Sequence, residues 1–221
     1  MIVGIELTLI SIIQGVALTF LIESAKDLIS TRAIFFWPYI VAGLLVIFVF
    51  WSRSVLHIIT VIRWPLEFGH NFLYIACALI EALLFTRINN PRAWFAFATL
   101  FGAIGWMLFV YDLRLIRARR QDSAGVASNR LITVVMRDQW QNISVLLPAV
   151  LLSNLGCYLC IRFWPETFVD RRWHVLLITA QVAGFGAYLF YIVRYFKAIT
   201  PLIVEARAEW QRAADEASVS S

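Results

Sequence analysis

Charged residues are scarce in this sequence. Lys and Arg number 19 and Asp and Glu number 14, so charged residues make up 15% of the 221 positions while 61% are hydrophobic. Soluble domains have about 25% charged and about 45–50% apolar residues. No basic stripe with interleaved aromatic residues is present, so nucleic acid is not an expected partner despite the formal net charge of +5. The apolar residues instead occupy long runs over most of the chain, which leaves no room for a separate soluble domain.

Residues suited to covalent, redox or metal chemistry are equally few, with three Cys and three His. Cys77, Cys157 and Cys160 lie within apolar runs, which is not the pattern of a secreted disulfide framework. The sequence contains no phosphate-binding glycine loop, nucleophile elbow or cluster of metal ligands. We therefore expect no enzymatic activity, no cofactor and no metal site.

The apolar residues gather in six long runs, each near the length of about 20 residues that crosses a hydrocarbon core. The short alternating segments of a membrane barrel are not seen. The sequence predicts an all-α polytopic membrane protein, with a six-helix bundle over residues 1–199 and a short amphipathic cytoplasmic tail over 200–221. The predicted spans are 5–23, 34–51, 68–86, 93–112, 143–163 and 174–196.

Two proline residues mark expected helix boundaries. Trp64-Pro65 is expected to turn the chain after the second run, because proline disfavours helix in the residue before it. Thr200 can cap the tail helix with Pro201 at its first position. The tail then repeats apolar residues at helical spacing, which predicts a separate amphipathic helix.

The distribution of basic residues predicts the orientation. If the six runs cross the membrane alternately, 12 of the 19 Lys and Arg residues fall on the side of the chain ends and seven on the other. The positive-inside rule then predicts a protein of the cell (inner) membrane with both termini in the cytoplasm. Most of the difference comes from the stretch "RLIRARRQDSAGVASNR" at 114–130, a topology signal that can also bind anionic lipid headgroups. Residues 129–140 are expected to form an interfacial helix.

The first run carries small and hydroxyl residues at spacings of three and four, which place them on one side of a helix. Gln14 lies about 80° from the centre of this stripe, and we expect both to face the protein interior. The stripe packs against a neighbouring helix or lines a pore. Ile12 and Leu18 flank it as candidate hydrophobic constrictions. The stripe consists of Gly4, Thr8, Ser11, Gly15 and Thr19.

The third run has the most polar face, and its role is open at this point. One alternative is a di-metal site built on Glu67-x-x-His70, although the second copy of the motif that such sites need is missing. Another is a haem between His57 and His70. A third is an ion path with Glu81 deep in the membrane. The plain alternative is a polar cap formed by Glu67, His70 and Asn71, with Glu81 paired to an outer Arg, at position 87 or 162.

Further polar groups lie in the last two runs. Asn154 and Gln181 are expected to hydrogen-bond between helices, which commonly stabilises membrane helix packing. Cys157 and Cys160 form a Cys-x-x-Cys pair, and only Cys77 is left for an electron relay. The incomplete relay favours packing over redox chemistry for these cysteines.

Three features of the runs carry a family resemblance. "QGV" at 14–16 precedes "ALTFLIE" in the first, Trp51 lies near the inner end of the second, and Asn71 comes early in the third. In these features the chain resembles the prokaryotic six-helix branch of the endolysosomal potassium channel family. That family's first-helix signature, an Arg followed by Phe-Ser-Asp, is absent here, with Thr8 at the place of the Arg. The resemblance implies a tetramer whose first helices line a central pore gated by bulky apolar side chains.

The sequence thus favours an ion-conducting homo-oligomer in a lipid bilayer, with its pore lined by the first helix. The main alternative is a non-catalytic scaffold or accessory subunit that binds a cytoplasmic or membrane protein partner, or an effector controlled by such a partner. The third alternative is a redox protein linked to haem or quinone.

Overall fold

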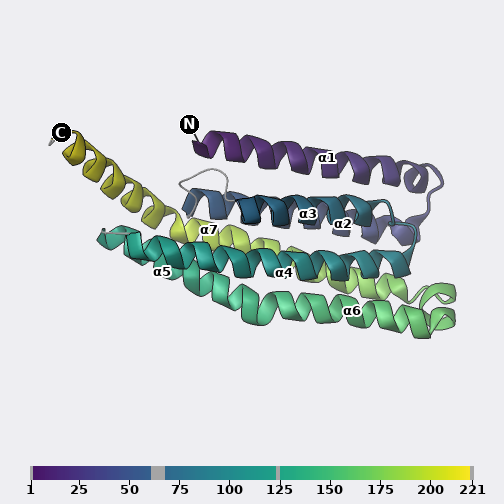
Figure 1. Cartoon of the computed structure of the whole chain (residues 1–221). Helices are drawn as coiled ribbons and strands as arrows, with labels where there is room; N and C mark the ends of the chain where they lie inside the picture. The colour runs from purple at the N-terminus through teal and green to yellow at the C-terminus, as the bar shows by residue number, and fades with distance from the viewer. Residues whose placement is uncertain (1, 61–67, 123–124, 220–221) are drawn as a thin grey trace.

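The computed structural model describes residues 2–60, 68–122 and 125–219, with side chains except at 2–6, 119–122, 213–214 and 217–219. All elements in these ranges are helical, as predicted (Figure 1). Short 3-10 or π segments join some of the α-helices, at Ile34–Phe36, Asn142–Leu146 and Glu166–Asp170. The α-helices are α1 (Ile2–Ser30), α2 (Trp37–Thr60), α3 (Phe68–Phe85), α4 (Pro91–Asp122), α5 (Val126–Gln141), α6 (Leu147–Phe163) and α7 (His174–Val219).

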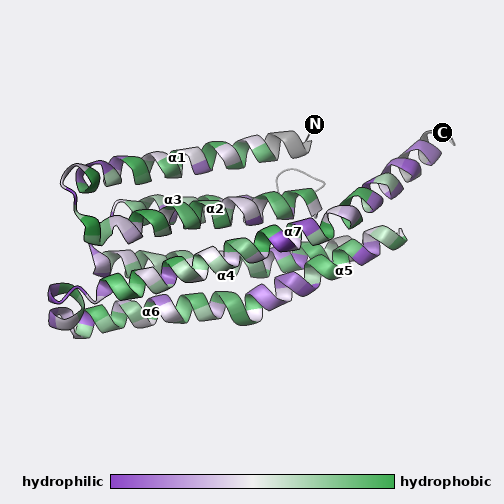
Figure 2. Cartoon of the chain, turned by 180° about the vertical axis from the view of Figure 1, so that it is seen from behind, coloured by the Kyte–Doolittle hydropathy of each residue, from purple (hydrophilic) through white to green (hydrophobic). Residues whose placement is uncertain are grey.

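Six helical segments of the described chain are long and apolar enough to cross a membrane. Large apolar side chains are exposed along them, and hydrophilic residues concentrate near the helix ends, along α5 and in the C-terminal part of α7 (Figure 2). This pattern indicates a multi-pass membrane protein. The six segments are Leu7–Ser30, Ile34–Thr60, Phe68–Phe85, Pro91–Ala118, Val126–Phe163 and His174–Arg212.

The helices pack as two rows that meet at α1. α1 contacts α2 and α3; one row continues from α2 to α7 and the other from α3 through α4 to α6. α5 lies between α4 and α7 at the end of the bundle that carries both chain termini, called here the termini end (Figure 1). Gly43 permits the close contact of α1 with α2, because a Cβ there would lie 2.8 Å from Leu21 Cδ1.

The fifth predicted span is part of a longer helical segment. α5 continues into α6 through a π segment, Asn142–Leu146, so the predicted interfacial helix and the span form one helical rod. Pro148 explains the π segment, since it has no N–H to donate to the carbonyl of residue 144 and its ring crowds that carbonyl. The wider turn lets the helix continue past the proline.

The separate tail helix was a wrong prediction. α7 continues without a break from His174 to Val219 with Pro201 inside it, and the hydroxyl of Thr200 donates to the carbonyl of Phe196 and does not cap a helix start. Ile199 and Ile203 are buried against α5 residues in one apolar cluster. Burial on both sides of the proline outweighs the lost backbone hydrogen bond. The turn predicted at Trp64-Pro65 lies outside the described residues.

The N-terminus of α5 is capped by a carboxylate of α7, that of Glu209. The backbone N–H groups of Ala127 and Ser128 donate to Glu209 at 2.9 and 3.0 Å, which satisfies two of the free donors at a helix start. We expect Glu209→Ala to speed amide hydrogen exchange at residues 127 and 128. The exposed Glu205 on the same helix provides the matched variant, Glu205→Ala, and equal exchange in both variants would contradict the role of Glu209.

Candidate functional site

Buried polar groups form three neighbouring clusters between the apolar helices. The first joins α1 to α3, the second joins α2, α3 and α4, and the third joins α2 to α5 and α7. Each is built from side chains that are distant in sequence, so each depends on the tertiary fold. The buried charged or titratable members are Arg53, His57, His70, Glu81, Asp112 and Asp138.

The first cluster is a pair formed by Glu81 and Gln14. Glu81 is 0% exposed, and the Gln14 amide donates to its Oε2 at 3.2 Å. The remaining side-chain oxygens, Glu81 Oε1 and Gln14 Oε1, are buried and have no hydrogen-bond partner among the described residues. The expected ion pair with an outer Arg does not form, because Arg87 and Arg162 are both exposed. α3 presents Glu81 to α1, whereas Arg87 lies beyond the end of α3.

Tyr74 lies between the first and second clusters. Its ring stacks on Phe50 with centroids 4.9 Å apart and on His70 at 6.5 Å. Its hydroxyl lies near Gln14 and Ser54 but makes no hydrogen bond of acceptable geometry with a described residue. The first and second clusters therefore follow one another along α3.

The second cluster consists of His57, His70 and Asp112. Asp112 Oδ1 lies 2.7 Å from His70 Nδ1 and 3.6 Å from His57 Nε2. The two imidazole rings stack with centroids 5.6 Å apart and planes 12° apart. One ligand atom from each of the three residues lies within 4.8 Å of the other two. The sequence predicted a link between His57 and His70 only as possible haem ligands, and the part of Asp112 in this cluster was not predicted.

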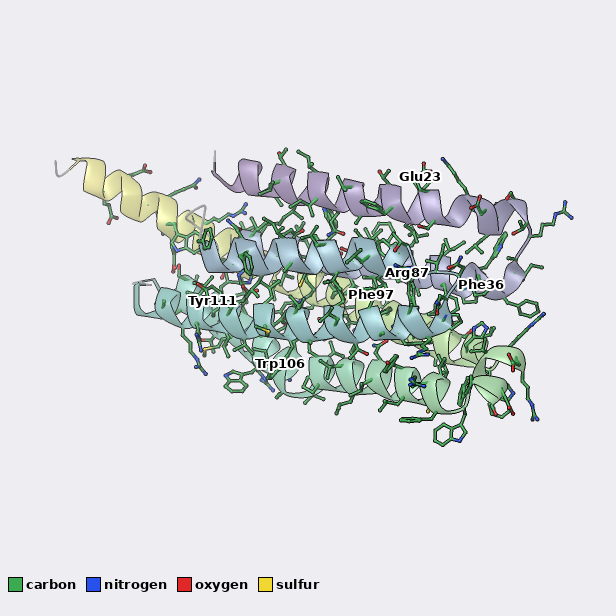
Figure 3. All side chains as sticks on the ribbon, turned by 45° about the vertical axis from the view of Figure 1, so that its right-hand side comes forward. Glu23, Phe36, Arg87, Phe97, Trp106 and Tyr111 are labelled. Atoms are coloured by element: carbon green, nitrogen blue, oxygen red, sulfur yellow. The ribbon has the colours of Figure 1, made fainter. Side chains whose placement is uncertain are left out.

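Close contact between α3 and α4 sets the position of His70. A Cβ on Gly69 would lie 2.7 Å from the hydroxyl oxygen of Tyr111, so a larger residue in this first turn of α3 would require the Tyr111 ring to move. Tyr111 is labelled in Figure 3, toward the termini end of α4. The next residue on each helix, His70 and Asp112, then forms the 2.7 Å contact.

The third cluster is built around a buried ion pair. Arg53 donates to Asp138 at 2.8 Å, and both side chains are under 10% exposed. The hydroxyl of Tyr191 donates to the other carboxylate oxygen at 2.6 Å, and the guanidinium lies over the ring of Phe109. The pair therefore links α2 to α5 and α7 near the termini end.

Two cavities adjoin these clusters. A cavity of about 30 Å³ is lined by the second and third clusters, including His57, His70 and Asp112. A larger one of about 350 Å³ lies between the two helix rows and is lined mainly by apolar residues of α2, α4, α6 and α7. Asn154 and Gln181 border the larger cavity and form the predicted interhelical bond, at 2.8 Å. Trp94 donates to Gln181 at 3.0 Å and thereby joins α4 to α7.

The stripe on α1 faces away from the bundle. Four of its members are exposed, namely Thr8, Ser11, Gly15 and Thr19. The prediction of one interior-facing sector is therefore wrong within this chain: Gln14 faces inward, and the stripe does not. The reason is that α1 lies at the edge of the bundle and buries the more apolar face that holds Ala17 and Leu21. Ile12 is exposed and Leu18 packs against the core.

The other candidates fall in different places. Glu67 lies outside the described residues, and Asn71 is half-buried. A haem held by His57 and His70 does not fit, because a cavity of about 30 Å³ cannot admit a porphyrin. Cys77 and Cys157 belong to separate apolar clusters.

Arg53 and Asp112 had a signal in the sequence. On α2, Phe50, Arg53 and His57 repeat at spacings of three and four, and on α4 Leu108 and Asp112 are four apart. These positions fall on the buried face of each helix. Arg53 was interpreted only as a topology signal.

No protein-family model, curated protein or solved structure matches the chain. The resemblance to the potassium channel family stays a prediction, and the function is inferred from the geometry.

Proposed function

We propose that this chain is a multi-pass membrane protein that conducts cations, protons included, along the interface of α1 and α3. Glu81 is the cation-binding carboxylate and Gln14 is its polar partner. The observation that supports this function most directly is a fully buried carboxylate in an apolar bundle whose hydrogen bond comes from a neutral amide.

The energetics of burial favour a positively charged occupant. A carboxylate removed from water costs several kcal/mol unless a counter-charge or a proton compensates it. Among the ion pairs of the described residues, none involves Glu81. One side-chain oxygen of Glu81 and one of Gln14 have no hydrogen-bond partner among the described residues, and oxygen is the ligand type that hard cations prefer. Ionisable residues within membrane helices commonly mark such paths.

The topology proposed with this function follows from the basic residues. The excess of Lys and Arg on the side of the chain ends favours an inner-membrane protein with both termini in the cytoplasm. The termini end of the bundle, with the His and Arg clusters, would then be the cytoplasmic end.

The exposed stripe of α1 favours a second candidate, a pore between copies of the chain. An exposed line of small and hydroxyl residues follows one side of α1, namely Thr8, Ser11, Gly15 and Thr19. Copies arranged around an axis would bring these lines together, with Ile12, 59% exposed, as the constriction. The scaffold alternative uses the same face to bind a different protein.

Cation flux into proteoliposomes tests the first candidate. We expect Glu81→Gln to reduce flux by about tenfold or more, because loss of about 1.4 kcal/mol of attraction at the site suffices for that factor. Glu23→Gln is the matched control: Glu23 lies on the outward side of α1 (Figure 3) and pairs with Lys26 at an exposed site. Wild-type flux in the control and low flux in Glu81→Gln support the path along α3.

Thr19→Leu separates the two candidates. Blocked flux in Thr19→Leu with normal flux in Glu81→Gln would place the pore between copies and overturn the path at Glu81. Absence of flux from intact wild-type protein, under proton, sodium and potassium gradients in turn, would overturn conduction altogether and favour the scaffold.

A further inference from the structure

We propose that His57, His70 and Asp112 bind one divalent first-row transition-metal ion at the termini end of the bundle. This site is separate from the proposed cation path, because Glu81 lies 11 residues after His70 on α3, about three helical turns away. It also differs from a di-metal site built on Glu67-x-x-His70, because it does not use Glu67.

The spacing of the three side chains matches that of metal ligands. Bonds of about 2.0–2.2 Å in a tetrahedral site place ligand atoms about 3.3 Å from one another. Here Asp112 Oδ1 lies 2.7 and 3.6 Å from the two histidine nitrogens, and all three ligand atoms lie within 4.8 Å. Small side-chain movements therefore suffice to surround one ion.

An unpartnered nitrogen points to a ligand at this position. His57 is 7% exposed, and its Nε2 has no hydrogen-bond partner among the described residues. Its distance of 3.6 Å from Asp112 is too long for a hydrogen bond. A buried polar atom without a partner destabilises the fold, and a metal ion bound to this nitrogen would remove that cost.

The ligand chemistry selects the kind of metal. Two imidazoles and one carboxylate suit Zn²⁺ or another first-row divalent ion, whereas Ca²⁺ and Mg²⁺ prefer sites made of oxygen alone. The same cavity wall contains Arg53, but Asp138 pairs with it at 2.8 Å. If both histidines are neutral, Arg53, Asp112 and Asp138 give this cavity wall a net charge of −1. A negative wall favours the binding of a cation.

The surroundings provide room and rigidity. The adjoining cavity of about 30 Å³ has room for a water molecule as the fourth ligand of an ion. The ligands come from α2, α3 and α4, of which α3 and α4 pack closely. The ring of His70 also stacks on His57 and on Tyr74. His57 lies three residues before the end of α2 and His70 two residues after the start of α3, so the site is close to the end of the bundle.

Metal binding by the purified full-length chain tests the site. The protein is produced with a tag that lacks histidine, stripped with a chelator and dialysed against Zn²⁺, and bound zinc is measured by mass spectrometry. We expect one ion per chain. His57→Ala and Asp112→Asn should weaken binding by about 100-fold or more, because even the outer partners of metal ligands contribute 10–100-fold. His174→Ala is the control, since His174 bonds to Tyr39 near the opposite end of the bundle and should leave binding unchanged.

A spectroscopic measurement on the wild type covers the case in which the variants do not fold. X-ray absorption of the zinc-loaded chain should show nitrogen and oxygen ligands with imidazole scattering. Sulfur ligands would assign the metal to the cysteines and overturn the proposal. Less than one zinc per chain at micromolar free Zn²⁺, or folded variants that bind as tightly as wild type, would overturn it as well. None of these results depends on cation flux, so the metal site and the path at Glu81 can fail separately.

Discussion

Asp138→Ala is expected to lower the free energy of unfolding by about 3–5 kcal/mol, the usual cost of removing one partner from a buried ion pair. Arg53, 7% exposed, would keep its charge inside the bundle without the carboxylate that it contacts at 2.8 Å. Tyr191 would also lose the acceptor for its hydroxyl. The measurement is unfolding in mixed micelles, followed by circular dichroism as denaturing detergent is added.

The double variant Arg53→Met with Asp138→Leu separates the charge effect from a packing effect. Removing both charges leaves no buried ion, and such replacements are often neutral or stabilising. We therefore expect most of the lost stability to return. The exposed Asp27 gives the matched control, Asp27→Ala, with a change within about 0.5 kcal/mol. A cost below about 1 kcal/mol for Asp138→Ala would contradict the structural role of the pair.

Trp94→Ala is expected to destabilise the fold by about 3–5 kcal/mol, as large core truncations do. Trp94 is 0% exposed, meets the ring of Tyr39 edge-on at 5.3 Å, and donates to Gln181 at 3.0 Å. The substitution would remove both the packing and the hydrogen bond that joins α4 to α7. The same unfolding assay measures it.

Trp94→Phe divides this cost into its two parts. It keeps an aromatic ring in the core but removes the N–H, so we expect a smaller loss, of about 1–2 kcal/mol. Trp51, 40% exposed on α2, provides the control Trp51→Ala. Equal destabilisation by Trp94→Ala and Trp51→Ala would show that burial at position 94 does not stabilise the bundle.

The six helical segments could be predicted because each depends on a local property, the length of an apolar run. The buried face of α2 was also readable, since Phe50, Arg53 and His57 recur at helical spacing. The partner of each buried polar side chain could not be predicted from periodicity in this way. Arg53 and Asp138 are 85 residues apart, and which helix faces which is decided by packing across the whole bundle.

Residues on α1 show the same limit. Periodicity groups Thr8, Ser11, Gly15 and Thr19 on one side of the helix, and the structure keeps them together. Periodicity alone does not predict whether that side of the helix faces the interior of the bundle. The inward direction is decided by Ala17 and Leu21, which meet α2 and α3 in the core, and by the bond of Gln14 to Glu81.

The two-row packing has a mechanical consequence. α6 and α7 follow each other in sequence but belong to different rows and make few direct contacts. The hydrogen bonds of Gln181 with Asn154 and Trp94 connect the two rows at this edge. At the opposite edge, α1 connects them by packing against both α2 and α3. The two rows are therefore expected to move relative to each other as a hinge about α1. The amplitude of this motion should be largest at the α6–α7 edge and smallest at Gln14 and Glu81.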